Sequence, residues 1–105
     1  MKPGDPILKK CRSILELLYG ERLKGIVLYG SSARGTDTEE SDIDLLVLLE
    51  GPVAVGAEIF RIWDVLYPVQ LETDRVISVM PADAEGYRNG ESMLYRNAQE
   101  DGVPV

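Results

Sequence analysis

The sequence of 105 residues contains no histidine, only one cysteine and no long apolar run. Without histidine, Ser-His-Asp and Cys-His catalytic arrangements and histidine-ligated zinc sites are excluded. The single cysteine, Cys11, cannot form an internal disulfide, which argues against an oxidising compartment. No apolar stretch approaches the roughly 20 residues that span a bilayer, and the charged start does not resemble a signal peptide. We therefore expect a cytoplasmic protein.

Basic residues are also scarce relative to acidic ones. The chain has 18 aspartates and glutamates against 11 lysines and arginines, which gives a net charge of −7. Tight binding to a nucleic-acid backbone needs basic side chains that displace counterions, so this balance disfavours nucleic acid and suits a basic protein partner. The hydrophobic content of 45% and the charged content of 28% are typical of a globular protein. The length predicts a single domain over residues 1–105.

The hydrophobic pattern predicts alternating helices and strands. Asp5 and Pro6 suit the start of a first helix with an apolar face, and Gly20 suits its end. The pattern α-β-β-α-β-β-α predicts an α/β (α+β) fold, with helices packed on a small mixed β-sheet. The further elements are strands at Gly25–Tyr29 and Leu45–Leu49, a helix at Gly56–Leu66, strands at Pro68–Glu72 and Arg75–Met80, and short helices within Ala82–Tyr87 and Gly90–Asp101.

One stretch between the first two strands carries the chemistry. Gly30 and Gly35 bracket small or flexible residues, so the backbone between them can turn sharply and approach a ligand. Asp42 and Asp44 open the second strand two residues apart, so both carboxylates point to one face, while Ile43 points to the core. Adjacent carboxylates are costly unless a cation neutralises them, and Mg²⁺ shared with substrate phosphates is the usual solution. The stretch therefore predicts a magnesium–phosphate site.

These residues resemble a known signature. Gly30-Ser31, a spacer of ten residues and Asp42-Ile43-Asp44 together resemble the motif of the DNA polymerase β-type nucleotidyltransferase superfamily. The insert Ala33-Arg34-Gly35 and the run Ser41 to Leu45 are most similar to its small prokaryotic branch, the minimal nucleotidyltransferase (MNT) proteins. Many of those are antitoxins paired with HEPN toxins. The resemblance implies a nucleotidyltransferase-like fold.

The resemblance also implies roles for these residues. The Gly30 amide and the Ser31 hydroxyl would hold the β and γ phosphates, and Asp42 and Asp44 would bind Mg²⁺ as the catalytic pair. ATP would be the donor, and a tyrosine hydroxyl on a partner HEPN toxin would accept AMP. Arg34 lies between the two glycines and could reach the triphosphate with several donors; the alternative is an exposed surface arginine.

Competent members of the superfamily carry a third carboxylate on a neighbouring strand. The expected strand 75–80 offers none, so Glu72 on the preceding strand is the candidate third metal ligand, the alternative being a surface glutamate. Asp37, Glu39 and Glu40 are expected to be solvated loop acids, because a loop holds a metal less rigidly than a strand. Without a third acid, a second hypothesis stands beside the enzyme: a catalytically degenerate MNT protein that acts as a binding antitoxin.

Overall fold

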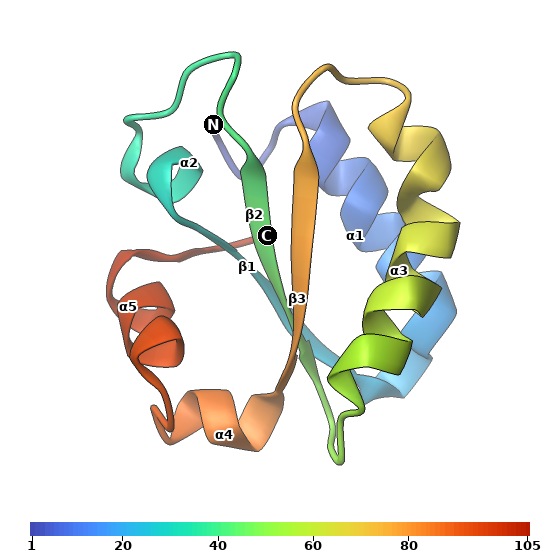
Figure 1. Cartoon of the computed structure of the whole chain (residues 1–105), viewed down its shortest axis with the longest axis vertical. Coiled ribbons are helices and arrows are strands. Elements are labelled where there is room, and N and C mark those ends of the chain that lie inside the picture. Colours follow the sequence, from blue (N-terminus) through green and yellow to red (C-terminus); the bar gives the residue numbers. More distant parts are fainter.

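The computed structural model describes all 105 residues as a four-stranded mixed sheet with helices on both faces (Figure 1). The strand order is β3-β2-β1-β4. The predicted α+β class with a small mixed sheet is confirmed. In chain order the elements are α1 (Pro6–Tyr19), the 3₁₀ turn η1 (Gly20–Arg22), β1 (Leu23–Tyr29), α2 (Ser31–Arg34), β2 (Ile43–Leu49), α3 (Val55–Gln70), β3 (Ile77–Asp83), α4 (Ala84–Arg88), α5 (Met93–Asp101) and β4 (Val103–Pro104).

Strand β2 is central, as its continuous apolar sequence predicts. It pairs antiparallel with β1 and parallel with β3. Its first polar residue, Asp44, lies opposite Tyr29 of β1 and opposite Ser78 of β3. The five residues that follow, Leu45 to Leu49, are all buried. Near the start of β2, Asp44 therefore lies between a residue of β1 and a residue of β3.

Alternation of side chains along β2 separates two apolar cores. Ile43 and Leu45 belong to the larger core, formed with buried residues of α1 and α3. Leu46 and Leu48 belong to the smaller core on the opposite face, which Ala98 of α5 completes. Because side chains two apart share a face, Asp44 points to the same face as Leu46. The candidate carboxylate thus lies on the face that α4 and α5 cover.

Helix α1 forms as its sequence predicts. The Asp5 side chain accepts a hydrogen bond from the backbone N–H of Ile7, and Pro6 occupies the first turn. Cys11 lies on the buried face of this helix, and burial raises the pKa of its thiol to about 11. A thiol of that pKa is protonated at neutral pH, so Cys11 packs as a small apolar residue.

The predicted strand 68–72 is wrong, because α3 continues through it to Gln70. Buried Ile62, Leu66 and Val69 keep a helical spacing on both sides of Pro68. Packing of this face on the sheet and on α1 outweighs the backbone hydrogen bond that a proline cannot donate. The helix is therefore longer than the predicted segment 56–66.

The strand predicted at 75–80 begins and ends later, at Ile77 and Asp83, and runs parallel to β2. The predicted segments 68–72 and 75–80 therefore do not pair as neighbouring strands, and the long helix α3 is the crossover that the parallel pair β2–β3 requires. Pro81 lies inside this strand, which is tolerated because β3 is at the sheet edge. The last residues of the chain add β4, which pairs antiparallel with β1. None of the helices combines the length and apolar character that a membrane span needs.

Candidate active site

The turn after β1 is built on two glycines with positive φ. Gly30 has φ 71° and ψ −154°, a conformation that is essentially restricted to glycine. The helical turn α2 follows directly, and Gly35 ends it with φ 76° in the left-handed region. A Cβ atom on Gly30 would lie 2.6 Å from Oδ2 of Asp44, whereas nothing lies within 4 Å of the same position on Gly35. The turn and the carboxylate are therefore in direct contact.

This contact gives a first prediction, for Gly30→Ala. The substitution introduces both backbone strain, worth about 1–3 kcal/mol, and a clash that displaces the Asp44 carboxylate. We expect it to destabilise the protein in urea unfolding and to weaken the binding of Mn²⁺–ATP at least 10-fold in titration calorimetry.

Gly35→Ala is the matched control, because it adds strain at a positive φ without a clash. Its nucleotide affinity should stay within about 3-fold of the unsubstituted protein, since no functional group is displaced. Equal losses of binding in both variants would contradict a role for the Gly30–Asp44 contact.

The two aspartates lie in different environments. Asp42 is exposed immediately before β2, and Asp44 is partly buried. Burial, and after it the negative charge of Asp42, raises the pKa of Asp44. Burial and the charge of Asp44 likewise raise the pKa of Tyr29. These shifts describe a local excess of negative charge that a cation would relieve.

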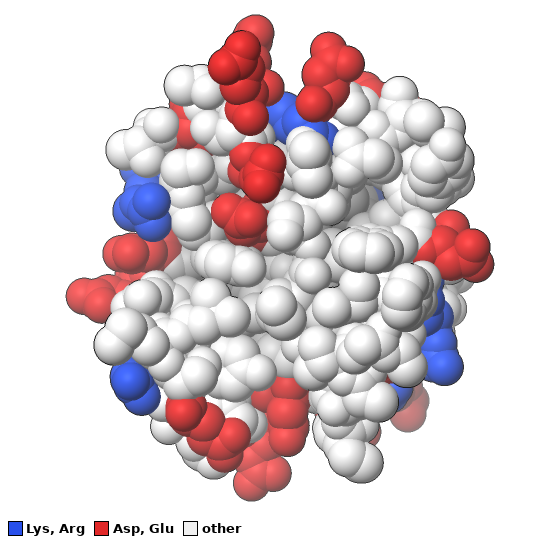
Figure 2. Space-filling model, viewed as in Figure 1, with Lys and Arg blue, Asp and Glu red and all other residues white.

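Figure 2 shows one group of acidic side chains in the upper half of this face, over the region where β2 and β3 begin, and another at its lower edge. Asp42 and Asp44 would supply two hard oxygen ligands, which would fit an ion such as Mg²⁺ that completes its octahedron with water and substrate phosphates. No group of three or more acidic, cysteine or histidine side chains is arranged to hold a metal by itself. The arrangement therefore fits a metal that arrives with phosphates.

A serine occupies the position where a third carboxylate would face the pair. Ser78 of β3 is the direct partner of Asp44 in the parallel ladder, so both side chains point to the same face. Glu72 lies beyond the end of α3 and forms an ion pair with Lys10 of α1. The expectation that Glu72 lies on a strand beside the aspartates is wrong, because that strand is the end of α3. The structure does not bring Glu72 together with them.

Arg34 ends the helical turn α2 and is exposed. It makes no ion pair within the chain, so its guanidinium is free to bind a ligand. Together with Tyr29, Gly30 and residues of α5 it lines a cavity of about 160 Å³. Two of the candidate phosphate-binding residues, Gly30 and Arg34, thus border a hollow between the turn and α5, whereas Ser31 does not line it.

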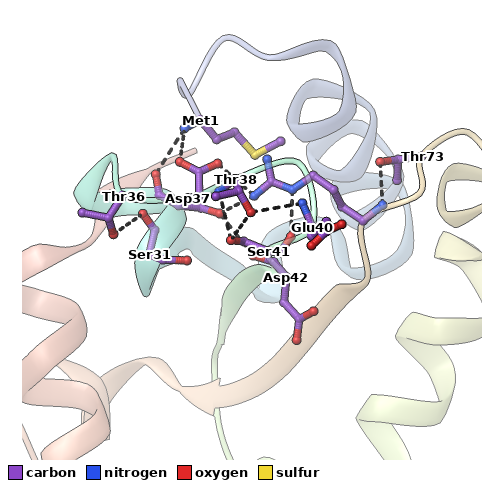
Figure 3. A network of polar contacts seen from close by, with 11 residues as sticks. Met1, Ser31, Thr36, Asp37, Thr38, Glu40, Ser41, Asp42 and Thr73 are labelled. Atoms are coloured by element: carbon purple, nitrogen blue, oxygen red, sulfur yellow. Dashed lines mark hydrogen bonds and ion pairs between the residues drawn. The ribbon is translucent and has the colours of Figure 1, made fainter.

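The sequence interpretation missed a polar network behind the turn. Asp37 was expected to be solvated, but its side chain is only 10% exposed and pairs with Arg75 and with the N-terminal ammonium of Met1 (Figure 3). The hydrogen bond from that ammonium, together with Arg75, lowers the pKa of Asp37. Ser32, which appeared to be a spacer residue, is fully buried and binds Arg75. No sequence pattern joins these residues, because Arg75 lies 43 positions from Ser32.

The glycine-bounded turn, the Asp-x-Asp strand and the mixed sheet define the class of protein. The family model for the nucleotidyltransferase domain matches residues 8–102, and the chain belongs to this family. This confirms the resemblance to the minimal nucleotidyltransferases.

Short matches to individual proteins agree with the family. Three proteins of Methanocaldococcus jannaschii, each named "Putative protein adenylyltransferase", are similar to part of this chain. One is 49% identical over 44 residues, which are 42% of this chain and 44% of that protein. A second is 54% identical over 41 residues, 39% of each chain. A third is 48% identical over 44 residues, 42% of this chain and 27% of that protein. The aligned part therefore spans less than half of each relative.

Proposed function

We propose that the protein is a Mg²⁺-dependent nucleotidyltransferase that transfers AMP from ATP to a hydroxyl group of a partner protein. The observation that carries the proposal is the direct approach of the Gly30 turn to the Asp44 carboxylate, with Asp42 beside it. Residues that would bind phosphates and residues that would bind a metal are therefore neighbours. Family membership and the names of the relatives support the same reaction class.

Each residue has a role in this reaction. The Gly30 amide and the Ser31 hydroxyl would bind the β and γ phosphates, and Arg34 would add charge-assisted hydrogen bonds to the triphosphate. Asp42 and Asp44 would hold Mg²⁺, which supplies Lewis-acid stabilisation of the charge on the phosphates when bound. The acceptor oxygen attacks the α phosphorus in line, the bond to the bridging oxygen of the β phosphate breaks, and pyrophosphate leaves. The hydroxyl proton passes to solvent or to a neighbouring carboxylate.

The acceptor in the proposal is a tyrosine of a HEPN-type toxin. This step rests on the resemblance to MNT antitoxins and on the relatives' names, which describe protein adenylyltransferases. The net charge of −7 suits a basic protein acceptor better than a nucleic acid. Modification of the toxin would then be the antitoxin activity.

One observation favours a second candidate function. Ser78 stands where a third carboxylate would face the aspartate pair, so the metal site has fewer protein ligands than the competent relatives imply. A protein with a weakened metal site could neutralise a toxin by binding alone. In this alternative the chain is a catalytically degenerate binding antitoxin.

Transfer of label from α-³²P-ATP to a HEPN-type toxin separates the two functions. The enzyme predicts Mg²⁺-dependent labelling that disappears in Asp42→Asn and Asp44→Asn, together with loss of neutralisation. The binding alternative predicts no labelling and full neutralisation by both variants. Gly35→Ala serves as a folded control that should keep both properties.

A further inference from the structure

We infer that Arg75 is a positioning residue, whose guanidinium sets the spacing between the Gly30–Ser31 turn and the aspartates Asp42 and Asp44. Arg75 precedes β3 and belongs to neither group. The inference rests on the proposed function, because it concerns the assembly of the same nucleotide pocket.

One guanidinium contacts three separate segments. Nε of Arg75 donates to the main-chain oxygen of Ser41 at 2.9 Å. Nη2 donates to the hydroxyl of Ser32 at 2.8 Å and lies 2.9 Å from Oδ2 of Asp37. These partners come from the end of the spacer loop, from the helical turn α2 and from the middle of the loop. The planar fork of an arginine reaches all three from two nitrogen atoms that are held apart, whereas a lysine ammonium offers its three donors from one atom.

Ser32 extends this link to the metal-binding strand. Its fully buried hydroxyl accepts from Arg75 and donates to the main-chain oxygen of Asp42 at 3.2 Å. The carbonyl of Ser41, on the other side of the Asp42 residue, is held by Arg75 directly. The main chain is therefore fixed both before and after Asp42. This restraint matters because the Asp42 side chain itself is exposed.

The positive charge of Arg75 is balanced within the chain by Asp37, so we assign Arg75 to holding the pocket in shape and not to binding the ligand. Its side chain is 14% exposed, and that of its ion-pair partner Asp37 is 10% exposed. The ammonium of Met1 lies 3.0 Å from the other Asp37 oxygen (Figure 3). Nε and Nη2 of Arg75 are thus already used within the chain, in contrast to the donors of exposed Arg34. Fixed hydrogen bonds behind a ligand-binding group commonly change its affinity 10–100-fold when removed.

The test measures the Kd of Mn²⁺–ATP by electron paramagnetic resonance, together with thermal unfolding, for Arg75→Lys and Arg75→Met. Lysine keeps the charge near Asp37 but loses the fork. We expect Arg75→Lys to retain most of the thermal stability and still to bind Mn²⁺–ATP at least 10-fold more weakly. A purely electrostatic or packing role would instead restore the affinity with lysine.

Ser32→Ala and Thr73→Val complete the experiment. Ser32→Ala removes the link to Asp42 without removing a charge, and should weaken Mn²⁺–ATP binding about 3–10-fold even if Arg75→Met fails to fold. Thr73→Val is the control, because Thr73 Oγ1 accepts only from the Arg75 backbone N–H and leaves the guanidinium contacts intact. Unchanged affinity in Arg75→Lys and Ser32→Ala would overturn the inference about Arg75 and leave the proposed function standing. Absence of Mn²⁺–ATP binding by the unsubstituted protein would overturn the inference and the proposed function together.

Discussion

Asp44→Asn is expected to abolish nucleotidyl transfer, by more than about 100-fold, while making the metal-free protein more stable. The carboxylate is a metal ligand in the proposed reaction, so the amide loses the charge that holds Mg²⁺. In the metal-free protein the same charge is unfavourable, because burial and the neighbouring Asp42 raise the pKa of Asp44. The residue therefore destabilises the empty pocket and becomes favourable only when a cation is bound.

The pH dependence of this stability difference follows from the direction of the pKa shift. A carboxyl with a raised pKa in the folded state destabilises that state when ionised, and the cost is fully present above the folded pKa. As the pH falls through the raised pKa, Asp44 takes up a proton and the cost disappears. The stability advantage of Asp44→Asn should thus be largest near neutral pH and vanish below the pKa of the unfolded chain.

Thermal unfolding of the unsubstituted protein and of Asp44→Asn in EDTA, between neutral and acidic pH, measures this difference in stability directly. Asp42→Asn is the comparison variant, since it removes the neighbouring charge without removing a buried group. Asp42→Asn should also abolish transfer, and it should raise the stability of the metal-free protein less than Asp44→Asn does. A lower Tm for metal-free Asp44→Asn than for the metal-free unsubstituted protein at neutral pH would contradict the electrostatic description of the pocket.

Ser78→Asp is expected to raise the affinity for Mg²⁺ about 10–100-fold and to increase transfer. Ser78 is the ladder partner of Asp44, so an aspartate there presents a third carboxylate to the same face. Three acids bind the cation more strongly than two, and they repel one another more strongly when it is absent. The variant should accordingly unfold at a lower temperature in EDTA and regain stability on addition of Mg²⁺.

Ser78→Asn is the control for this gain, because it has nearly the same shape as aspartate and no charge. Its metal affinity should stay close to that of the unsubstituted protein in a Mn²⁺ titration. Equal affinities in Ser78→Asp and Ser78→Asn would show that position 78 does not face the metal. A gain in affinity without a gain in transfer would favour the binding antitoxin over the enzyme.

The sequence predicted the parts of the pocket that are local in the chain. The turn depends on Gly30 at the end of a strand, and Asp42 lies near enough to Asp44 for its charge to act on that carboxyl because the two are only two residues apart at the start of β2. The central position of β2 followed from its unbroken apolar run. These properties depend on residues within one stretch, so a single sequence contains enough information to infer them.

Features that depend on packing between distant elements could not be predicted from local sequence patterns. Pro68 marked the end of a helix by local rules, but α3 continues to Gln70 because its buried face packs on the sheet and on α1. With that helix misjudged, Glu72 was placed on a strand that does not exist. The Arg75 network was also invisible, because its partners come together only in the folded chain.

Isothermal titration calorimetry with ATP, in Mg²⁺ and in EDTA, tests the central claim most directly. The account predicts one binding site for each chain in Mg²⁺, together with at least 10-fold weaker binding in EDTA, in Asp42→Asn and in Gly30→Ala. Absence of heat with any Mg²⁺–nucleoside triphosphate, or binding that is indifferent to both the metal and the aspartates, would contradict it.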